Sequence, residues 1–330
     1  HSIYFFPHFI MNEFPLNEFF LEDRIQYFGD PNQQQNGFSQ KDPVNVMVLT
    51  SVRDVGTCDK NGSMVDTPEG RQHMEGIVER IIVETQESGR LHDILRLVGV
   101  ITDDLERDMR RSEYSPYPDT EKQWIHNRDL RDVNGELVAG DDMTHWLPSD
   151  FRSLPLHDAE GRARHKEEFE QRVLELMQQR NADVLVSDHY MARIAYMIQD
   201  RYGKFGKVLN IHPAVTKQGD PYCFRGPTPT QDAIDRAKAD GQAQTGATLH
   251  FVNEVIDDGP QIAYVSGTSV YPNDEPQHLR YRNYQQAKLP LFVSGVRHYI
   301  EKIYPHINAL DLNNLSLLNH VSTRDSETGN

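Results

Sequence analysis

Short apolar segments alternate with helical segments through the middle of this chain, and this alternation constrains the fold more than any other feature. The apolar segments are rich in Val, Leu and Ile, as strands buried on both faces of a sheet are. They are residues 44–50, 95–102, 183–187 and 207–212. Helical periodicity lies between them, at residues 67–88 and 163–180. The order of strands and helices predicts an α/β fold: a Rossmann-like, mainly parallel twisted sheet with flanking helices and right-handed crossovers.

Further elements are expected around this framework. A helix should follow residue 194 and end near residue 202, and another should cover residues 230–240. Two strands are expected on either side of an acidic turn, at residues 247–252 and 261–269. A last helix is expected at residues 279–304.

Three parts of the chain are predicted from composition. Residues 1–43 form an N-terminal extension, with a short helix laid on the domain and then a linker. Residues 44–305 form the catalytic domain, and residues 306–330 form a flexible C-terminal tail. Within the domain, residues 103–155 form a long charged insertion after the second strand.

Charge and cysteine content exclude several classes of function. The formal net charge is −16, which argues against nucleic-acid binding because a phosphate backbone requires a basic face. The two cysteines, Cys58 and Cys223, give neither a disulfide framework nor metal-ligand spacing, so no metal is expected. No apolar run approaches the roughly 18 residues of a membrane helix, and the first residues lack the basic region of a signal peptide. A cytoplasmic protein without a membrane partner is expected.

Three polar side chains stand at the ends of predicted strands. Asn210 and His212 alternate along the strand that stops at Pro213, so they share one face of the sheet. Asp257 lies in the acidic turn that Gly259 closes. An amide, an imidazole and a carboxylate at neighbouring strand ends can meet at one point, where they would suit acyl transfer.

Each of these side chains has an assigned role in that chemistry. Asn210 and His212 would donate hydrogen bonds to the oxyanion that develops during acyl transfer. Asp257 would raise the pKa of His212 and help to move the proton that the attacking nitrogen releases. His250 is expected to pack on its strand, and Cys223 is expected to be an inert thiol.

The same stretch resembles the catalytic half of the formyltetrahydrofolate-dependent formyltransferases. Residues 210–213 read Asn-Ile-His-Pro, as in the N-x-H-P hallmark of the superfamily, and Asp257 matches its acidic turn. Residues 225–234 resemble its R-G-x-x-P-x-x-x-A-I segment, and residues 245–248 its T-G-x-T strand entry. The motifs occur in the order found in the family, which makes the combination specific.

The resemblance implies a transferase that uses 10-formyltetrahydrofolate as formyl donor. Asn210, His212 and Asp257 would then be catalytic. The residues expected to bind the folate are Met191, Ala192, Arg193, Ile194, Glu254, Val255, Ile256, Asp258 and Gly259. Those expected to bind the acceptor are Arg53, Arg225 and Gly226.

The acceptor is expected to be a small amine or hydroxylamine. Residues 51–62 replace the glycine- and serine-rich phosphate loop of the purine-pathway members, which argues against glycinamide ribonucleotide. This loop and the long insertion are similar to those of the hydroxyornithine formyltransferases of siderophore biosynthesis. N5-hydroxyornithine is therefore the preferred acceptor, with Arg53 meeting its carboxylate.

Three other interpretations stay open at this point. The acceptor could be an amino-sugar nucleotide, or water could replace it and formate would be released. The chain could also be a non-catalytic folate-binding relative that docks a partner through its acidic surface. The sequence does not determine the oligomeric state.

Overall fold

The computed structural model describes most of the predicted domain. The described residues are 24–28, 42–51, 76–103, 105, 130–131, 137–139, 143–190, 192–199 and 206–309. They form an eight-stranded sheet in the order β1-β10-β9-β8-β7-β2-β3-β6, together with a separate two-stranded ladder of β4 (Leu130–Arg131) and β5 (Leu137–Ala139).

The sheet has a parallel half and an antiparallel half. The parallel half contains β2 (Val44–Thr50), β3 (Leu95–Thr102), β6 (Thr144–Trp146), β7 (Val184–Asp188) and β8 (Val208–His212). The antiparallel half joins at β8 and contains β9 (Ala243–Phe251), β10 (Gln261–Val270) and β1 (Gln26–Tyr27). The mainly parallel sheet confirms the predicted fold class.

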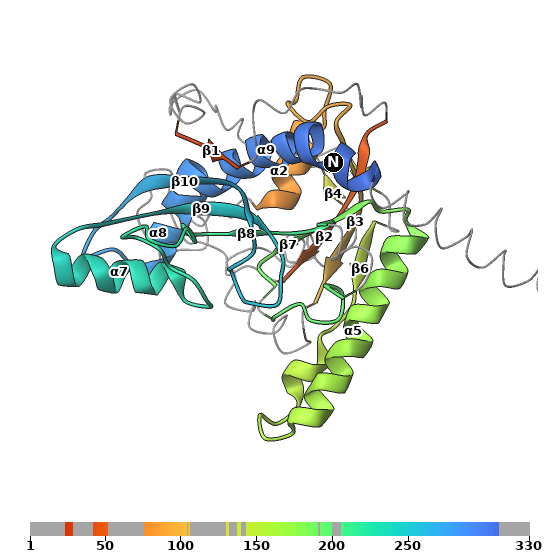
Figure 1. Cartoon of the computed structure of the whole chain (residues 1–330), viewed down its shortest axis with the longest axis horizontal. Coiled ribbons are helices and arrows are strands. Elements are labelled where there is room, and N and C mark those ends of the chain that lie inside the picture. The colour runs from red at the N-terminus through yellow and green to blue at the C-terminus, as the bar shows by residue number, and fades with distance from the viewer. Residues whose placement is uncertain are drawn as a thin grey trace, which may run out of the picture.

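Helices cover both faces of this sheet (Figure 1). One face packs against α2 (Ile77–Glu84) and α9 (Leu289–His298), and the other against α5 (Ala159–Gln179). A third apolar cluster joins α7 (Pro229–Asp240) and α8 (Pro276–Asn283) to the antiparallel half. The helix from α8 through α9 widens to π-helical geometry at Tyr284–Lys288 and again at Tyr299–Ile303.

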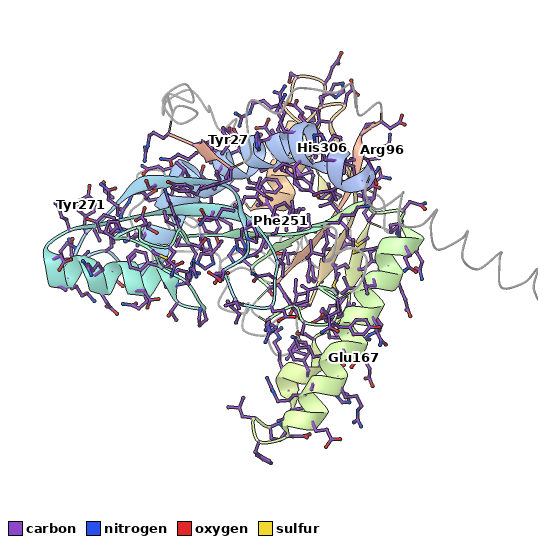
Figure 2. The ribbon with its side chains drawn as sticks, viewed as in Figure 1. Tyr27, Arg96, Glu167, Phe251, Tyr271 and His306 are labelled. Atoms are coloured by element: carbon purple, nitrogen blue, oxygen red, sulfur yellow. The ribbon has the colours of Figure 1, made fainter. Side chains whose placement is uncertain are left out.

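Helix α5 shows how the sequence determines one of these layers. The side chain of Asp158 caps its first turn by accepting a hydrogen bond from the Gly161 amide at 3.0 Å. Phe169 and Val173 lie on the stripe that faces the sheet and are buried. Glu167 lies on the exposed face (Figure 2). Burial of one apolar stripe therefore fixes how the helix lies on the sheet.

Three expected elements differ in the structure. Residues 24–28, within the predicted N-terminal extension, contribute strand β1, which pairs with β10, and no strand had been predicted there. Residues 195–199 form a bend and a turn where a helix had been predicted, and the rest of that predicted helix lies outside the described residues. The amides of residues 195–197 donate to the Glu170 side chain of α5. The last helix continues through residue 309, past Pro305. Pro305, which has no N–H to donate, lies directly after the π-helical stretch Tyr299–Ile303 and Tyr304 within this continuous helix.

The insertion at 103–155 contributes an edge strand that the sequence did not predict. Strand β6 pairs in parallel with β3, and a 3₁₀ turn at Asp150–Ser153 follows it. The predicted domain boundaries remain predictions, since much of residues 1–43 and residues 310–330 lie outside the described part of the chain.

Candidate functional site

Strand β8 brings Asn210 and His212 to the edge of the sheet where the parallel strands end. It lies between β7 and β9, at the junction of the parallel and antiparallel halves. Asn210 lies opposite His250 of β9, and His212 lies opposite Thr248. A junction between strands of different direction at this edge is a common position for ligand sites in α/β sheets.

The structure brings the three predicted catalytic side chains together. His212 Nδ1 lies 3.3 Å from Asp257 Oδ1, and Asn210 Nδ2 lies 3.5 Å from the same oxygen. Asp257 occupies the turn after β9 with a φ of 55°, a left-handed conformation that is uncommon for a residue with a side chain. The imidazole of His212 and the amide of Asn210 therefore both lie beside the same oxygen of the Asp257 carboxylate.

His250 belongs to this cluster, although the sequence predicted only a packing role for it. Its Nδ1–H donates to the Phe251 carbonyl at 2.9 Å, and this leaves Nε2 to accept from Asn210 Nδ2 at 3.1 Å. Nε2 also lies 3.7 Å from Asp257 Oδ1. His250 thus orients the Asn210 amide. Its place in an apolar run gave no sign of this, because the pairing of β8 with β9 sets the contact.

The protonation of His212 differs from the expectation. Burial lowers the pKa of this imidazole to about 4, although Asp257 acts in the opposite direction, and the positive charges of a protonated His250 and of Lys288 lower it further. Asp257 therefore does raise the pKa of His212, as predicted, but burial, which the sequence analysis did not consider, outweighs this contribution. In this structure His212 is neutral at pH 7.

The hydrogen bonds of His212 determine where a proton can be received. The Phe224 carbonyl oxygen, 2.9 Å away, can only accept, so neutral His212 carries its hydrogen on Nε2. The lone pair of Nδ1 then faces Asp257 Oδ1. A proton that reaches Nδ1 forms an imidazolium directly beside the carboxylate, which stabilises it.

The main chain around Asp257 holds the carboxylate in place. The Gly226 amide donates to Asp257 Oδ2 at 2.8 Å. Gly259 packs so closely that a Cβ there would lie 1.6 Å from the Phe251 carbonyl oxygen. Gly226, which was predicted to bind the acceptor, therefore contacts the Asp257 carboxylate through its backbone.

Arg225 is placed beside the same turn. Its guanidinium pairs with Asp258, and it donates to the Thr216 carbonyl through Nε at 3.0 Å and Nη2 at 2.7 Å. About one third of the side chain is exposed. These contacts brace the loop after β8 against the Asp257 turn.

The residues predicted to bind the folate fall into two groups near this edge. Glu254, Val255 and Ile256 lie on the exposed Asp257 turn, and Val255 and Ile256 are 58% and 54% exposed. Arg193 is exposed after β7, whereas the side chain of Ile194 lies in the core and leaves only its main chain available. Met191 and Arg53 lie outside the described residues. The folate-binding assignments remain predictions.

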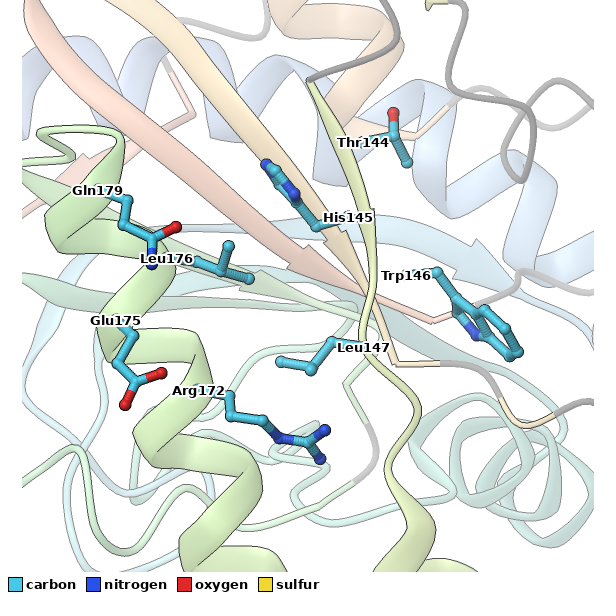
Figure 3. Close-up of a pocket in the computed structure, with 8 residues that line it drawn as sticks. All are labelled: Thr144, His145, Trp146, Leu147, Arg172, Glu175, Leu176 and Gln179. Atoms are coloured by element: carbon cyan, nitrogen blue, oxygen red, sulfur yellow. The ribbon is translucent and has the colours of Figure 1, made fainter.

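A cavity of about 480 Å³ lies elsewhere, between β6 and α5 (Figure 3). His145 and Leu147 face α5 across it, whereas Trp146 points away. Strands β7, β2 and β3 separate β6 from β8 in the sheet, so this cavity is not part of the His212 cluster.

Metal-ligand clusters and membrane-spanning helices are both absent from the described residues. Within them, no three His, Cys, Asp or Glu side chains are arranged to hold a metal ion. None of the helices in the described ranges has the length and apolar character needed to cross a membrane.

Comparisons with known proteins agree with this geometry. Residues 136–294, which include β7 to β10, match the formyl transferase family. The chain is 31% identical over 99 residues to the phosphoribosylglycinamide formyltransferase of Bacillus subtilis, covering 30% of this chain and 45% of that protein. It is 30% identical over 122 residues to the formyltetrahydrofolate deformylase of a Corynebacterium species, covering 37% of each. The match thus spans less than half the length of these relatives.

A solved structure matches over a larger share of the chain. PvdF of pyoverdin biosynthesis, an N10-formyltetrahydrofolate-dependent formyltransferase, superimposes with a TM-score of 0.61 at 25% sequence identity. The superposition covers 78% of this chain and the whole of the PvdF chain.

Proposed function

We propose that this protein is a member of the formyltransferase superfamily and transfers a formyl group from 10-formyltetrahydrofolate to the nitrogen of a small amine or hydroxylamine. One observation carries this proposal: the side chains of Asn210 and His212 both lie within 3.5 Å of Asp257 Oδ1, at the carboxyl end of β8. Formyl transfer needs a hydrogen-bond donor for an oxyanion and a group that handles a proton, and this cluster offers both.

Asn210 is suited to stabilise the oxyanion. As the acceptor nitrogen attacks the formyl carbon, the carbonyl electron pair moves onto oxygen, and a preorganised N–H donor there lowers the barrier. His250 holds the Asn210 amide so that its NH₂ group, and not its carbonyl, faces the cluster. Collapse of the intermediate breaks the bond to the folate nitrogen, which leaves with a proton.

His212 and Asp257 are suited to move that proton. Nδ1 of neutral His212 can accept the proton that the attacking nitrogen loses, and Asp257 then stabilises the imidazolium. The low pKa of His212 favours release of the proton to the departing folate nitrogen. The pair thus serves as acceptor and donor within one turnover.

The apolar tip of the Asp257 turn supports binding of the folate ring at this place. Val255 and Ile256 expose more than half of their surface, next to the reacting side chains. A flat, partly apolar ring that covers them would remove this surface from water, which is favourable.

For the acceptor, we propose N5-hydroxyornithine or a chemically similar hydroxylamine. The likeness to PvdF supports a siderophore-type acceptor. A hydroxylamine nitrogen is also largely unprotonated at neutral pH, so a weak base such as His212 is sufficient for it. Deformylase relatives make hydrolysis the competing reaction, since water can take the place of the amine.

An acceptor panel tests the proposal. The purified protein is incubated with 10-formyltetrahydrofolate and each of hydroxyornithine, ornithine, an amino-sugar nucleotide and glycinamide ribonucleotide, and the products are analysed by mass spectrometry. We expect hydroxyornithine to gain one formyl group. Formylation of another compound would change only the proposed identity of the acceptor. Formate production without any formylated acceptor would show that the reaction is hydrolysis and not transfer.

A further inference from the structure

Two buried charged side chains outside the catalytic cluster hold the chain segment that follows β7. The segment runs from Asp188 to Met197 and includes Arg193 and Ile194, which are predicted to lie beside the folate. Buried charges are costly unless they are paired, so each of them requires an explanation.

Glu170 of α5 holds the end of this segment. Its carboxylate is 1% exposed and accepts hydrogen bonds from the amides of Ala195, Tyr196 and Met197 at 2.6–3.0 Å. Lys166 lies 3.3 Å from the same carboxylate. A carboxylate that accepts three consecutive amides fixes the course of the backbone there, much as an anion does in a turn.

Lys288 holds the start of the segment. It lies in the π-helical stretch Tyr284–Lys288, is 1% exposed, and its ammonium pairs with Asp188 at the end of β7. It also donates to the Tyr284 hydroxyl at 3.1 Å, and that hydroxyl hydrogen bonds to His189 Nε2. Burial acts to lower the pKa of Lys288, but Asp188 and Tyr284 hold this pKa above its usual value, so the charge persists.

The backbone between these two supports has an uncommon shape. His189 has a φ of 60°, in the left-handed region that residues with a side chain adopt only uncommonly. Tyr190 then stacks on Phe169 at 5.7 Å between ring centroids, and Ile194 and Met197 enter the same apolar cluster. Tyr190 and Ile194 are therefore both fixed in this apolar cluster, while Arg193 is exposed.

We propose that Glu170 and Lys288 are positioning residues that preform residues 189–190 and 192–194 as one wall of the folate site. The inference rests on the proposed function, since it assumes that a folate binds beside this loop. The register supports this location, because Ser187 of β7 lies directly opposite Asn210 of β8. A preformed wall lowers the cost of binding, because the loop does not have to be ordered when the ligand arrives.

The first test uses Glu170 variants and binding of tetrahydrofolate, which carries no formyl group. We expect Glu170→Ala to raise the Kd for tetrahydrofolate about 10- to 100-fold, as small displacements of binding groups do. The KM for 10-formyltetrahydrofolate should rise equally, whereas the KM for the acceptor and kcat should change less than about twofold. Glu170→Gln keeps one oxygen as acceptor, so it should restore part of the affinity. Glu168→Gln, on an exposed position of α5, is the matched control.

The second test removes the other support without leaving an unpaired buried charge. The double variant Asp188→Asn, Lys288→Met loses both members of the ion pair and should raise the Kd for tetrahydrofolate in the same way. Lys302→Met, at an exposed position of the same helix, is the control and should leave this Kd unchanged. If Glu170→Ala does not fold, Glu170→Gln and the double variant decide the question.

The outcomes separate this inference from the function on which it rests. Wild-type protein that fails to bind tetrahydrofolate would contradict the proposed function. Wild-type protein that binds it, together with folded Glu170 and Lys288 variants of unchanged Kd, would overturn the positioning roles alone. Variants in which kcat and both KM values become worse to the same extent would also overturn the positioning roles, because such a result would indicate general structural damage.

Discussion

His212 Nδ1 lies 3.3 Å from Asp257 Oδ1, while the opposite ring nitrogen donates to a main-chain carbonyl. This arrangement leaves a lone pair facing a carboxylate in the neutral state and forms a charge-assisted hydrogen bond only after a proton arrives. Burial keeps the proton away at neutral pH. The pair is therefore ready to receive a proton during a reaction, and this is the basis of the proposed chemistry.

The stability of the folded protein should reflect the buried His212. Its pKa is lowered to about 4 when folded, against about 6.5 when unfolded. Between these values the unfolded chain binds the proton and the folded chain does not, so the free energy of unfolding should fall as pH drops from about 6.5 to 4. We expect urea denaturation of His212→Asn to show a weaker decline over this range. Part of the decline should remain in this variant, because burial also lowers the pKa of His250. A variant with the same pH dependence as the wild type would contradict the account.

Val255 and Ile256 should contribute to folate binding and little to stability. The double variant Val255→Ser, Ile256→Ser removes exposed apolar surface, so we expect the KM for 10-formyltetrahydrofolate to rise about tenfold. Its melting temperature should remain near that of the wild type, because both side chains face solvent. Leu156→Ser is a suitable control, since Leu156 is exposed but lies far along the chain in the turn before α5. An unchanged KM in the double variant would remove this loop from the site.

Gly259 should be essential to the position of Asp257. A methyl group there would meet the Phe251 carbonyl oxygen, so Gly259→Ala should destabilise the fold by about 3 kcal/mol and also reduce kcat. Gly241→Ala places a side chain at a φ of 81° in open space, so it should cost about 1–2 kcal/mol and leave kcat unchanged. Chemical denaturation and steady-state kinetics would show the difference. Full activity in Gly259→Ala would contradict the tight packing.

Asn210 should act on the transition state and not on substrate binding. Asn210→Ala removes the donor for the oxyanion, and we expect kcat to fall on the order of 100- to 1,000-fold with nearly unchanged KM values. His250→Phe, which removes the acceptor that orients the amide, should give a smaller loss of the same kind. A variant that raises only KM would assign Asn210 to binding.

Apart from the edge strand β6, the sequence was sufficient to predict the parallel half of the sheet and the strand end that carries Asn210 and His212. Both depend on local information, namely apolar runs that end at Pro213 or in an acidic turn. The convergence with Asp257 could also be expected, since neighbouring strand ends meet at one edge. The match of residues 136–294 to the formyl transferase family agrees with the resemblance seen in the sequence, and the catalytic roles stay predictions.

Features that depend on pairing between distant segments could not be predicted. The contact of His250 with Asn210 follows from the register of β9 on β8. The amides of residues 195–197 donate to Glu170, which lies 25 or more residues earlier in the chain. Burial of His212 reverses the pKa shift expected from Asp257 alone. The periodicity of apolar residues predicts none of these three features, because each depends on which elements pack together.

Transfer of an isotope-labelled formyl group from 10-formyltetrahydrofolate to hydroxyornithine, followed by mass spectrometry, tests the central claim most directly. The wild-type protein should formylate the acceptor, and Asp257→Asn and His212→Ala should do so about 100- to 10,000-fold more slowly, while Asp235→Asn, exposed on α7, should match the wild type. Undiminished transfer by either catalytic variant would contradict the account.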